Sequence, residues 1–284
     1  MIKSFIDDLK ANEIAIDEKV KEQFVKNYKS IHKVDEDDAL SFYEKEKTYF
    51  QQTILDDTGG LALCTPISLY SSFMEISITG LSIKKQAKAE AYIEKKSQKV
   101  KVGNVESWIN VARFVIQAHG ELSLRKRAGQ ILHAHNPIVV YDGDVFQPKT
   151  NDRGELIVEY VPKIPRESKT IIGCFVKLTL PNNIFDYKWL LKEDVERLQK
   201  ISAKSMKNDN GNALYSNNDG QIDVGFLETK TLKHALGTLG KLRISSSAIL
   251  ESVEVIEDES FAEKKEDTEN QNTGIVIKDD DSPF

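Results

Sequence analysis

Hydrophobic residues near the start of the chain recur at the spacing of an amphipathic helix. Two groups show this spacing, and they are Phe5, Ile6 and Leu9, and Val20, Phe24 and Tyr28. Charged residues fill most of the positions between them. The pattern therefore predicts short charged helices over residues 1–60.

Two further helices are predicted from the residues at their ends. Thr65 is a suitable N-cap, Pro66 fits the first helical position, and Gly80 can adopt the left-handed conformation that ends a helix. A second helix is predicted over Asn104–His119, with Gly120 ending it. Its apolar face consists of Trp108, Ile109, Ala112, Val115 and Ile116.

The pattern changes to alternation and to β-branched residues in the middle of the chain. Ile138–Tyr141 and Asp144–Phe146 flank Asp142-Gly143, a dipeptide that suits a type I′ turn, and this predicts a hairpin. Leu156–Val161 and Thr170–Leu180 predict two further strands. Together these segments predict an antiparallel meander.

Helical spacing returns over residues 192–206 and 223–240, and residues 207–220 have the composition of a loop. From residue 251 onward too little apolar surface remains to offset the entropy of ordering, which predicts a disordered tail. The sequence therefore predicts the α+β class in three parts. These are an acidic helical region that makes subunit contacts (1–60), a core (61–250) and an acidic tail (251–284).

The net charge of −6 conceals a segregation of charge along the chain. Residues 1–60 hold 14 acidic and 9 basic side chains, residues 81–130 hold 4 acidic and 11 basic, and residues 251–284 hold 12 acidic and 3 basic. A basic centre of net +7 between acidic ends suits a polyanionic ligand. The alternative interpretation is that these charge runs only solvate the surface.

The sequence lacks the motifs that mark several other classes of protein. Cys64 and Cys174 have no spacing typical of a metal site or a disulfide framework, which favours a reduced, cytoplasmic compartment. No phosphate-binding loop of the ATPase type is present, because Gly237–Leu242 lacks the spacing and the hydroxyl. We expect no signal peptide, no membrane span, no cofactor and no enzymatic activity. His133 and His135 could share one face of a strand, but no further metal ligand is evident nearby.

Lysines are concentrated between residues 80 and 101. They are Lys84, Lys85, Lys88, Lys95, Lys96, Lys99 and Lys101. Arg125-Lys126-Arg127 follows further along the chain, and Tyr92 lies among the lysines. Cations bind phosphates without sequence preference, and interleaved aromatic rings stack on unpaired bases, so the pattern favours single-stranded nucleic acid.

Five segments, in order, resemble the RecT family of phage-type single-strand annealing proteins. They are Gly80–Ile83 with Ala91–Ile93, Trp108–Leu122, Val139–Phe146, Ile171–Lys177 and Phe226–His234. The likeness covers about residues 65–245. It departs from the family pattern at Gln221-Ile222, where the family has Trp, at Glu94, where it has proline, and at Ala118, where it has a basic residue.

The resemblance implies a curved sheet flanked by helices, with a groove between a β-hairpin and a helix that holds one DNA strand by its phosphates. It also implies a ring or helical filament of subunits, ATP-independent annealing in homologous recombination, and a cognate exonuclease as partner. The candidate DNA-binding residues are Lys84, Lys85, Lys88, Tyr92, Lys95, Lys96, Lys99, Lys101, Arg113, Gln117, Arg125, Lys126, Arg127, Lys230, Lys233 and Lys241.

The last predicted helix, over residues 223–240, is called the closing helix, and its residue pattern also supports that groove. Its predicted core face is Leu227, Leu232, Ala235, Leu236 and Leu239, and its opposite face carries Lys230, Lys233, Gly237 and Lys241. The alternative is an ordinary solvated lysine face. Trp108 and Tyr141 are interpreted as core residues, whereas Tyr92 is a candidate for stacking on bases.

The sequence Asp279-Asp280-Asp281-Ser282-Pro283-Phe284 resembles the C-terminal tip of bacterial single-stranded-DNA-binding proteins. This resemblance predicts recruitment of host repair proteins through Asp279, Asp280, Asp281, Pro283 and Phe284. The alternative is a tail that only shields the basic groove. Two other functions stay open: a passive coat protein for single-stranded DNA, and a DNA-processing enzyme such as a nuclease.

Overall fold

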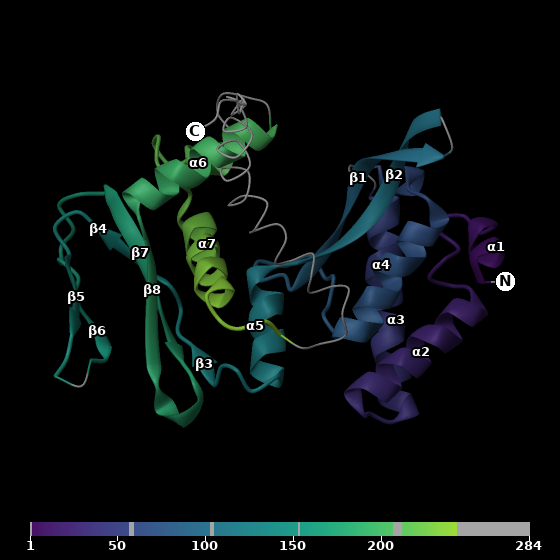
Figure 1. Ribbon diagram of the computed structural model, residues 1–284, viewed down its shortest axis with the longest axis horizontal. Helices are drawn as coiled ribbons and strands as arrows, with labels where there is room; N and C mark the ends of the chain where they lie inside the picture. Colours follow the sequence, from purple (N-terminus) through teal and green to yellow (C-terminus); the bar gives the residue numbers. More distant parts are fainter. Residues whose placement is uncertain (1, 57–59, 103–104, 153, 207–211, 243–284) are drawn as a thin grey trace, which may run out of the picture.

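The chain folds into two lobes that lie side by side, with one helix between them (Figure 1). The computed structural model describes residues 2–56, 60–102, 105–152, 154–206 and 212–242. The predicted acidic tail, and the part of the predicted loop over residues 207–211, lie outside the described residues. The α+β class with antiparallel sheets is confirmed.

The first lobe consists of helices and one long two-stranded ribbon. Its elements are α1 (Ile2–Asp7), α2 (Glu18–His32), α3 (Glu36–Leu55), the short η1 (Leu61–Leu63), α4 (Pro66–Thr79), β1 (Ala91–Val102) and β2 (Val105–Ile116). The predicted ends of α4 are confirmed, since Thr65 precedes Pro66 at its start and Gly80 ends it with φ of 61°.

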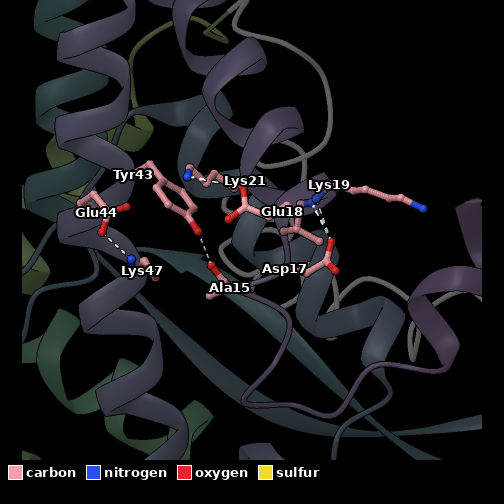
Figure 2. Close-up of polar contacts among 9 residues, drawn as sticks. Ala15, Asp17, Glu18, Lys19, Lys21, Tyr43, Glu44 and Lys47 are labelled. Carbon is pink, nitrogen blue, oxygen red and sulfur yellow. Dashed lines mark hydrogen bonds and ion pairs between the residues drawn. The ribbon is translucent and has the colours of Figure 1, made fainter.

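The turn before α2 is fixed by two side chains (Figure 2). The Asp17 carboxylate accepts hydrogen bonds from the backbone N–H groups of Lys19 and Val20 at 2.9 and 3.1 Å, which satisfies two donors that the helix leaves unpaired. The hydroxyl of Tyr43 donates to the carbonyl of Ala15 at 2.6 Å, and burial raises the pKa of Tyr43 to about 12. Helix α3 is thereby tied to the chain that enters α2.

An aromatic core joins these helices to the rest of the lobe. The ring of Phe73 lies 4.8 Å from that of Phe24 and 4.8 Å from that of Phe50, measured between centroids. Phe114 of β2 belongs to the same core. The core therefore does not divide at residue 60, and the acidic helices form one unit with the α4 segment and the ribbon.

The helix predicted over 104–119 is wrong, because residues 105–116 form β2, antiparallel to β1. Ala112, Phe114 and Ile116 are buried at every second position, so the apolar residues fit a strand as well as a helix. Gly120 does not end a helix either. It lies inside α5 (Ala118–Arg127), where an added Cβ would be 2.1 Å from the carbonyl oxygen of Glu90.

The second lobe contains a four-stranded antiparallel sheet built around one long strand. Strand β7 (Ile171–Thr179) pairs on one edge with β3 (His133–Ala134) and β4 (Ile138–Tyr141), and on the other edge with β8 (Phe185–Leu191). The sequence pattern predicted β4 and β7 but missed β8. The connection between β7 and β8 includes η2 (Pro181–Asn183).

The predicted hairpin over 138–146 is also wrong. The chain does turn at Asp142-Gly143, but β5 (Val145–Thr150) leaves the sheet and pairs with β6 (Leu156–Val161) instead of β4. Asp144 anchors this change of direction, since its carboxylate accepts hydrogen bonds from the N–H groups of Tyr141 and Lys163 at 3.0 and 2.8 Å. The meander is therefore divided between two sheets.

Two helices complete the second lobe, α6 (Lys192–Met206) and α7 (Val224–Gly237), after the short η3 (Ala213–Tyr215). Helix α7 packs on one face of the four-stranded sheet, with α5 beside it. The predicted core face of α7 is confirmed, because Leu227, Leu232, Ala235 and Leu236 are buried and Leu239 packs against the same core. Its predicted lysine face is turned away from that core.

Candidate nucleic-acid interface

A pocket of about 390 Å³ lies between the two lobes. The loop that precedes β1 and helix α5 form one wall, and the segment between β3 and β4 and the first turns of α7 form the other. The lining residues are Ala87, Lys88, His119, Asn136, Pro137, Gly225, Glu228, Thr229 and Leu232. One wall thus includes part of the lysine-rich segment, and the other includes the first turns of α7.

Two acidic side chains hold the lysine-bearing loop in place. The carboxylate of Glu46, in α3, accepts hydrogen bonds from the Ser82 hydroxyl at 2.7 Å and the Ile83 N–H at 3.0 Å. The carboxylate of Glu90 accepts from the Ser82 N–H at 3.1 Å and from the Ser123 hydroxyl at 2.7 Å. Burial raises the pKa of Glu46, although both hydrogen bonds oppose that rise. These hydrogen bonds therefore fix the start of the lysine-bearing loop at Ser82 and Ile83.

The loop exposes its three lysines to solvent. Lys88 lines the pocket, and Lys84 and Lys85 lie further from it along the loop. Lys85 is engaged in an ion pair with Asp56 at 3.0 Å. The sequence pattern does not distinguish the three lysines, whereas the structure places only Lys88 in the pocket wall.

Helix α7 puts one of its predicted lysines, Lys233, on the helix face next to the pocket. Lys233 follows Thr229 by four residues, so the helical repeat puts both on one face, and Thr229 lines the pocket. Lys230 lies with its ammonium 5.2 Å from the centroid of the Phe226 ring, one turn back along the helix. Lys241 is exposed beyond the end of α7. Of these three lysines, only Lys233 therefore lies on the helix face next to a pocket residue.

The β1–β2 ribbon continues directly from the pocket loop and carries the remaining lysines. Strand alternation and the register put Lys95, Lys99 and Lys101 on the same face as Trp108, with Lys99 directly opposite Trp108. Trp108 is 70% exposed, so its interpretation as a core residue is wrong. Lys99 is paired with Glu106 on the opposite strand.

The other face of the ribbon carries Lys96, Arg113 and Tyr92. Tyr92 is 39% exposed, and its hydroxyl donates a 3.4 Å hydrogen bond to Glu94. Arg113 stands opposite Glu94 in the register and is half-buried. The candidate residues of the ribbon therefore occupy two opposite faces, and they do not form one continuous surface.

Two arginines of the predicted basic triplet have structural roles. Arg125 is buried: its guanidinium pairs with Glu121 at 2.7 Å and donates to the Gly240 carbonyl at 2.9 Å. Arg127 donates to the carbonyl oxygens of Thr79 and Gly80 at 2.8 and 3.3 Å, where α4 ends. Arg125 is therefore removed from the candidate set, and of this triplet Lys126 keeps the position expected of a surface cation.

The structure also places four other residues that the sequence analysis considered. Gln117 is the N-cap residue of α5 and is half-buried, with its backbone N–H donating to the Glu90 carbonyl at 2.8 Å. Tyr141 is half-buried, and the Arg166 guanidinium carbon lies 3.8 Å from its ring centroid. The rings of His133, in β3, and His135, just after it, are exposed and meet edge to face at 4.7 Å between centroids.

Metal and thiol chemistry find no support among the described residues. In that part of the chain no three His, Cys, Asp or Glu side chains gather as a metal site would require. Cys64 and Cys174 are both buried free thiols, and burial raises the pKa of Cys174 to about 12. No described helix combines the length and hydropathy that a membrane span needs.

No protein-family model matches the sequence, and no significant match was found among curated proteins.

Proposed function

We propose that this protein binds single-stranded DNA and anneals it to a complementary strand without ATP. The observation that carries the proposal is the pocket between the lobes, which the exposed Lys88 lines and where Lys233 lies one helical turn from the lining residue Thr229. The net charge of +7 over residues 81–130 and the exposed aromatic residues of the ribbon support the same ligand class.

The mechanism needs no change to covalent bonds. Lysines neutralise the phosphates of the first strand and release its condensed counterions, which gives affinity without sequence preference. The bases stay available to a second strand, which samples registers weakly. Correct pairing adds about 1.4 kcal/mol of stacking for each base-pair step, so matched duplexes outlast mismatched ones.

The test is the rate at which two complementary fluorescent oligonucleotides pair, with and without protein, in the absence of ATP. We expect acceleration that fades as salt rises. Replacing Lys230 and Lys233 with Ala should remove the acceleration. It should also lower the slope of log affinity against log salt by about 0.7 for each phosphate that is no longer neutralised.

The matched control replaces Lys10 and Lys26 with Ala. Both are exposed lysines of the first lobe, far along the chain from the pocket, and their loss changes the net charge equally. This variant should retain the acceleration. If the protein binds DNA tightly but slows pairing, it is a passive coat protein. If it removes substrate in a magnesium-dependent reaction, it is a nuclease, and the proposal is wrong.

Assembly of subunits belongs to the same proposal. The first turn of α3 carries Glu36, Asp37 and Asp38, and this acidic end would lie against the basic surface of a neighbouring subunit. Contacts between opposite charges weaken as salt screens them. Sedimentation velocity across a salt series should therefore show smaller assemblies at high salt, and salt-insensitive oligomers would contradict this arrangement.

A further inference from the structure

The four-stranded sheet has two faces with different surroundings. Cys174, Val176 and Leu178 of β7 point to the inner face, which α7 and its neighbours cover. On the outer face, the rings of Phe146 and Tyr160 lie 5.2 and 5.4 Å from that of Phe175. The β5–β6 hairpin therefore packs against the outer face around Phe175, and it lies beside β8 in Figure 1.

The rest of the outer face forms two rows across the sheet. The register aligns His133, Thr179 and Phe185 in one row. The next row contains Lys177 and Tyr187, and His135 joins it through its N–H, which donates to the Lys177 carbonyl at 3.0 Å. We call His133, His135, Lys177, Phe185 and Tyr187 the aromatic platform.

The platform combines exposed rings with a cation. Phe185 is 50% exposed, and both histidine rings are exposed. The ammonium of Lys177 lies 3.7 Å from the centroid of Phe185 and 5.7 Å from that of Tyr187, so two rings hold the charge between them. Exposed large aromatic and apolar side chains of this kind mark an interaction surface.

The charge of the platform is positive. Neither of its two rows contains a carboxylate. Asp186 is the acidic residue between Phe185 and Tyr187, but strand alternation turns it to the inner face, where it pairs with Lys188 at 3.0 Å. The platform therefore complements an anion that also has flat faces to stack on the rings.

We propose that the aromatic platform is a second binding surface for single-stranded DNA. Unpaired bases would stack on Phe185 and Tyr187, and Lys177 would contact a phosphate. A duplex does not fit this chemistry, because its base faces are already stacked on one another. An acidic peptide would match Lys177 but would leave the rings without a stacking partner.

The platform and the pocket lie on opposite sides of the sheet. Helix α7 contributes Gly225, Glu228 and Thr229 to the pocket and packs on the inner face, whereas the platform occupies the outer face. Under the proposed function, one protein molecule could hold two strands, one on each surface. The role in annealing rests on that proposal, but binding at the platform can be measured independently of it.

The chain contains two tryptophans, Trp108 and Trp189, which provide a local probe. Trp189 lies on the outer face two residues from Tyr187, so replacing Trp108 with Phe leaves one tryptophan beside the platform. We expect an oligo(dT) of about ten nucleotides to quench the fluorescence of Trp189. Replacing Phe185 with Ala, or Lys177 with Gln, should weaken the binding seen by this probe about tenfold.

Three controls make the result specific. Lys10→Ala removes a positive charge from the first lobe and should retain the quenching, and the Lys230→Ala, Lys233→Ala variant leaves the platform intact and should also retain it. Polyglutamate supplies charge without bases and should not quench. His133→Ala with His135→Ala alters two exposed side chains and tests the platform without touching the β7–β8 pair.

The outcomes separate this inference from the proposed function. If the Phe185, Lys177 and histidine variants all bind like the parent while the pocket variant loses annealing, the platform is not a DNA site and the proposed function stands. If the platform variants lose quenching but the pocket variant anneals normally, the platform stands and the pocket assignment fails. Equal quenching by polyglutamate would overturn the stacking inference.

Discussion

The carboxylate of Glu46 accepts a 2.7 Å hydrogen bond from the hydroxyl of Ser82, although the two residues are 36 positions apart. The same carboxylate accepts the N–H of Ile83, so a buried side chain of α3 satisfies two polar groups of the lysine-bearing loop. An acidic residue of the first helices is therefore part of the support for the basic surface.

This hydrogen-bonded pair leads to a prediction about stability. Replacing Glu46 with Ala would leave the half-buried Ser82 hydroxyl and the buried Ile83 N–H without this acceptor, and should lower the free energy of unfolding by roughly 2–4 kcal/mol. Urea denaturation would measure the loss. Glu46→Gln is the control, because its amide can still accept from Ile83 while donating to Ser82. Equal stability of the two variants would contradict this role.

Trp108 should contribute to binding and not to stability. Its side chain is 70% exposed opposite Lys99, so Trp108→Ala should leave the melting temperature nearly unchanged and weaken single-stranded DNA binding roughly tenfold, because a stacking ring is removed. Fluorescence anisotropy of a labelled oligonucleotide would measure the affinity. Trp108→Phe should bind nearly as well as the parent, and a large drop in melting temperature for Trp108→Ala would refute the assignment.

Neighbouring residues of α5 should respond in opposite ways. Arg125→Ala leaves Glu121 buried without its 2.7 Å partner and should cost roughly 3–5 kcal/mol of unfolding free energy. Lys126→Ala alters an exposed side chain and should stay within about 0.5 kcal/mol of the parent. Chemical denaturation of both variants gives the comparison, and Arg125→Met with Glu121→Leu should recover much of the loss.

The first lobe should lose stability in mild acid through His32. Burial lowers the pKa of His32 below its usual 6.5, and the Arg127 guanidinium lowers it further, while the hydrogen bond to the Ser77 carbonyl at 3.1 Å opposes the change. The unfolded chain therefore takes up the proton first as pH falls. The stabilisation is complete above pH 6.5 and is lost as pH falls through the folded-state pKa.

Denaturant midpoints at neutral pH and at about pH 5 would measure this effect. His32→Gln cannot take up a proton but can still donate to the Ser77 carbonyl, so its stability should fall less between the two conditions. If the parent and the variant show the same pH dependence, other groups are responsible.

Local signals predicted several elements well. Thr65, Pro66 and Gly80 gave the bounds of α4, and the alternation in Leu156–Val161 gave β6. The strand β2 was mistaken for a helix because its apolar residues satisfy both repeats over a short window. The hairpin failed for a different reason: the partner of a strand is chosen by distant residues, and β4 pairs with β7 instead of its neighbour.

In the candidate site, too, the sequence identified residues through local signals and missed those that only the fold brings together. Lys88 and Lys233 were identified because charge and helical spacing are local properties. The aromatic platform was not, since Lys177, Phe185 and His133 become neighbours only through strand pairing. The pair His133 and His135 was the one part of it visible in the sequence. Trp108 was misassigned because its exposure depends on how far the ribbon extends past the first lobe's core.

Helix α5 belongs to both lobes, since Leu124 lies in the first core and Ala118 in a core of the second. Leu242, beyond α7, returns to the first core as well. Unfolding of either lobe would remove the packing contacts on one side of this shared helix, and this would destabilise the other lobe. The two lobes should therefore unfold in a single cooperative transition. Because α5 is packed into both cores, it also fixes the distance between the two walls of the pocket.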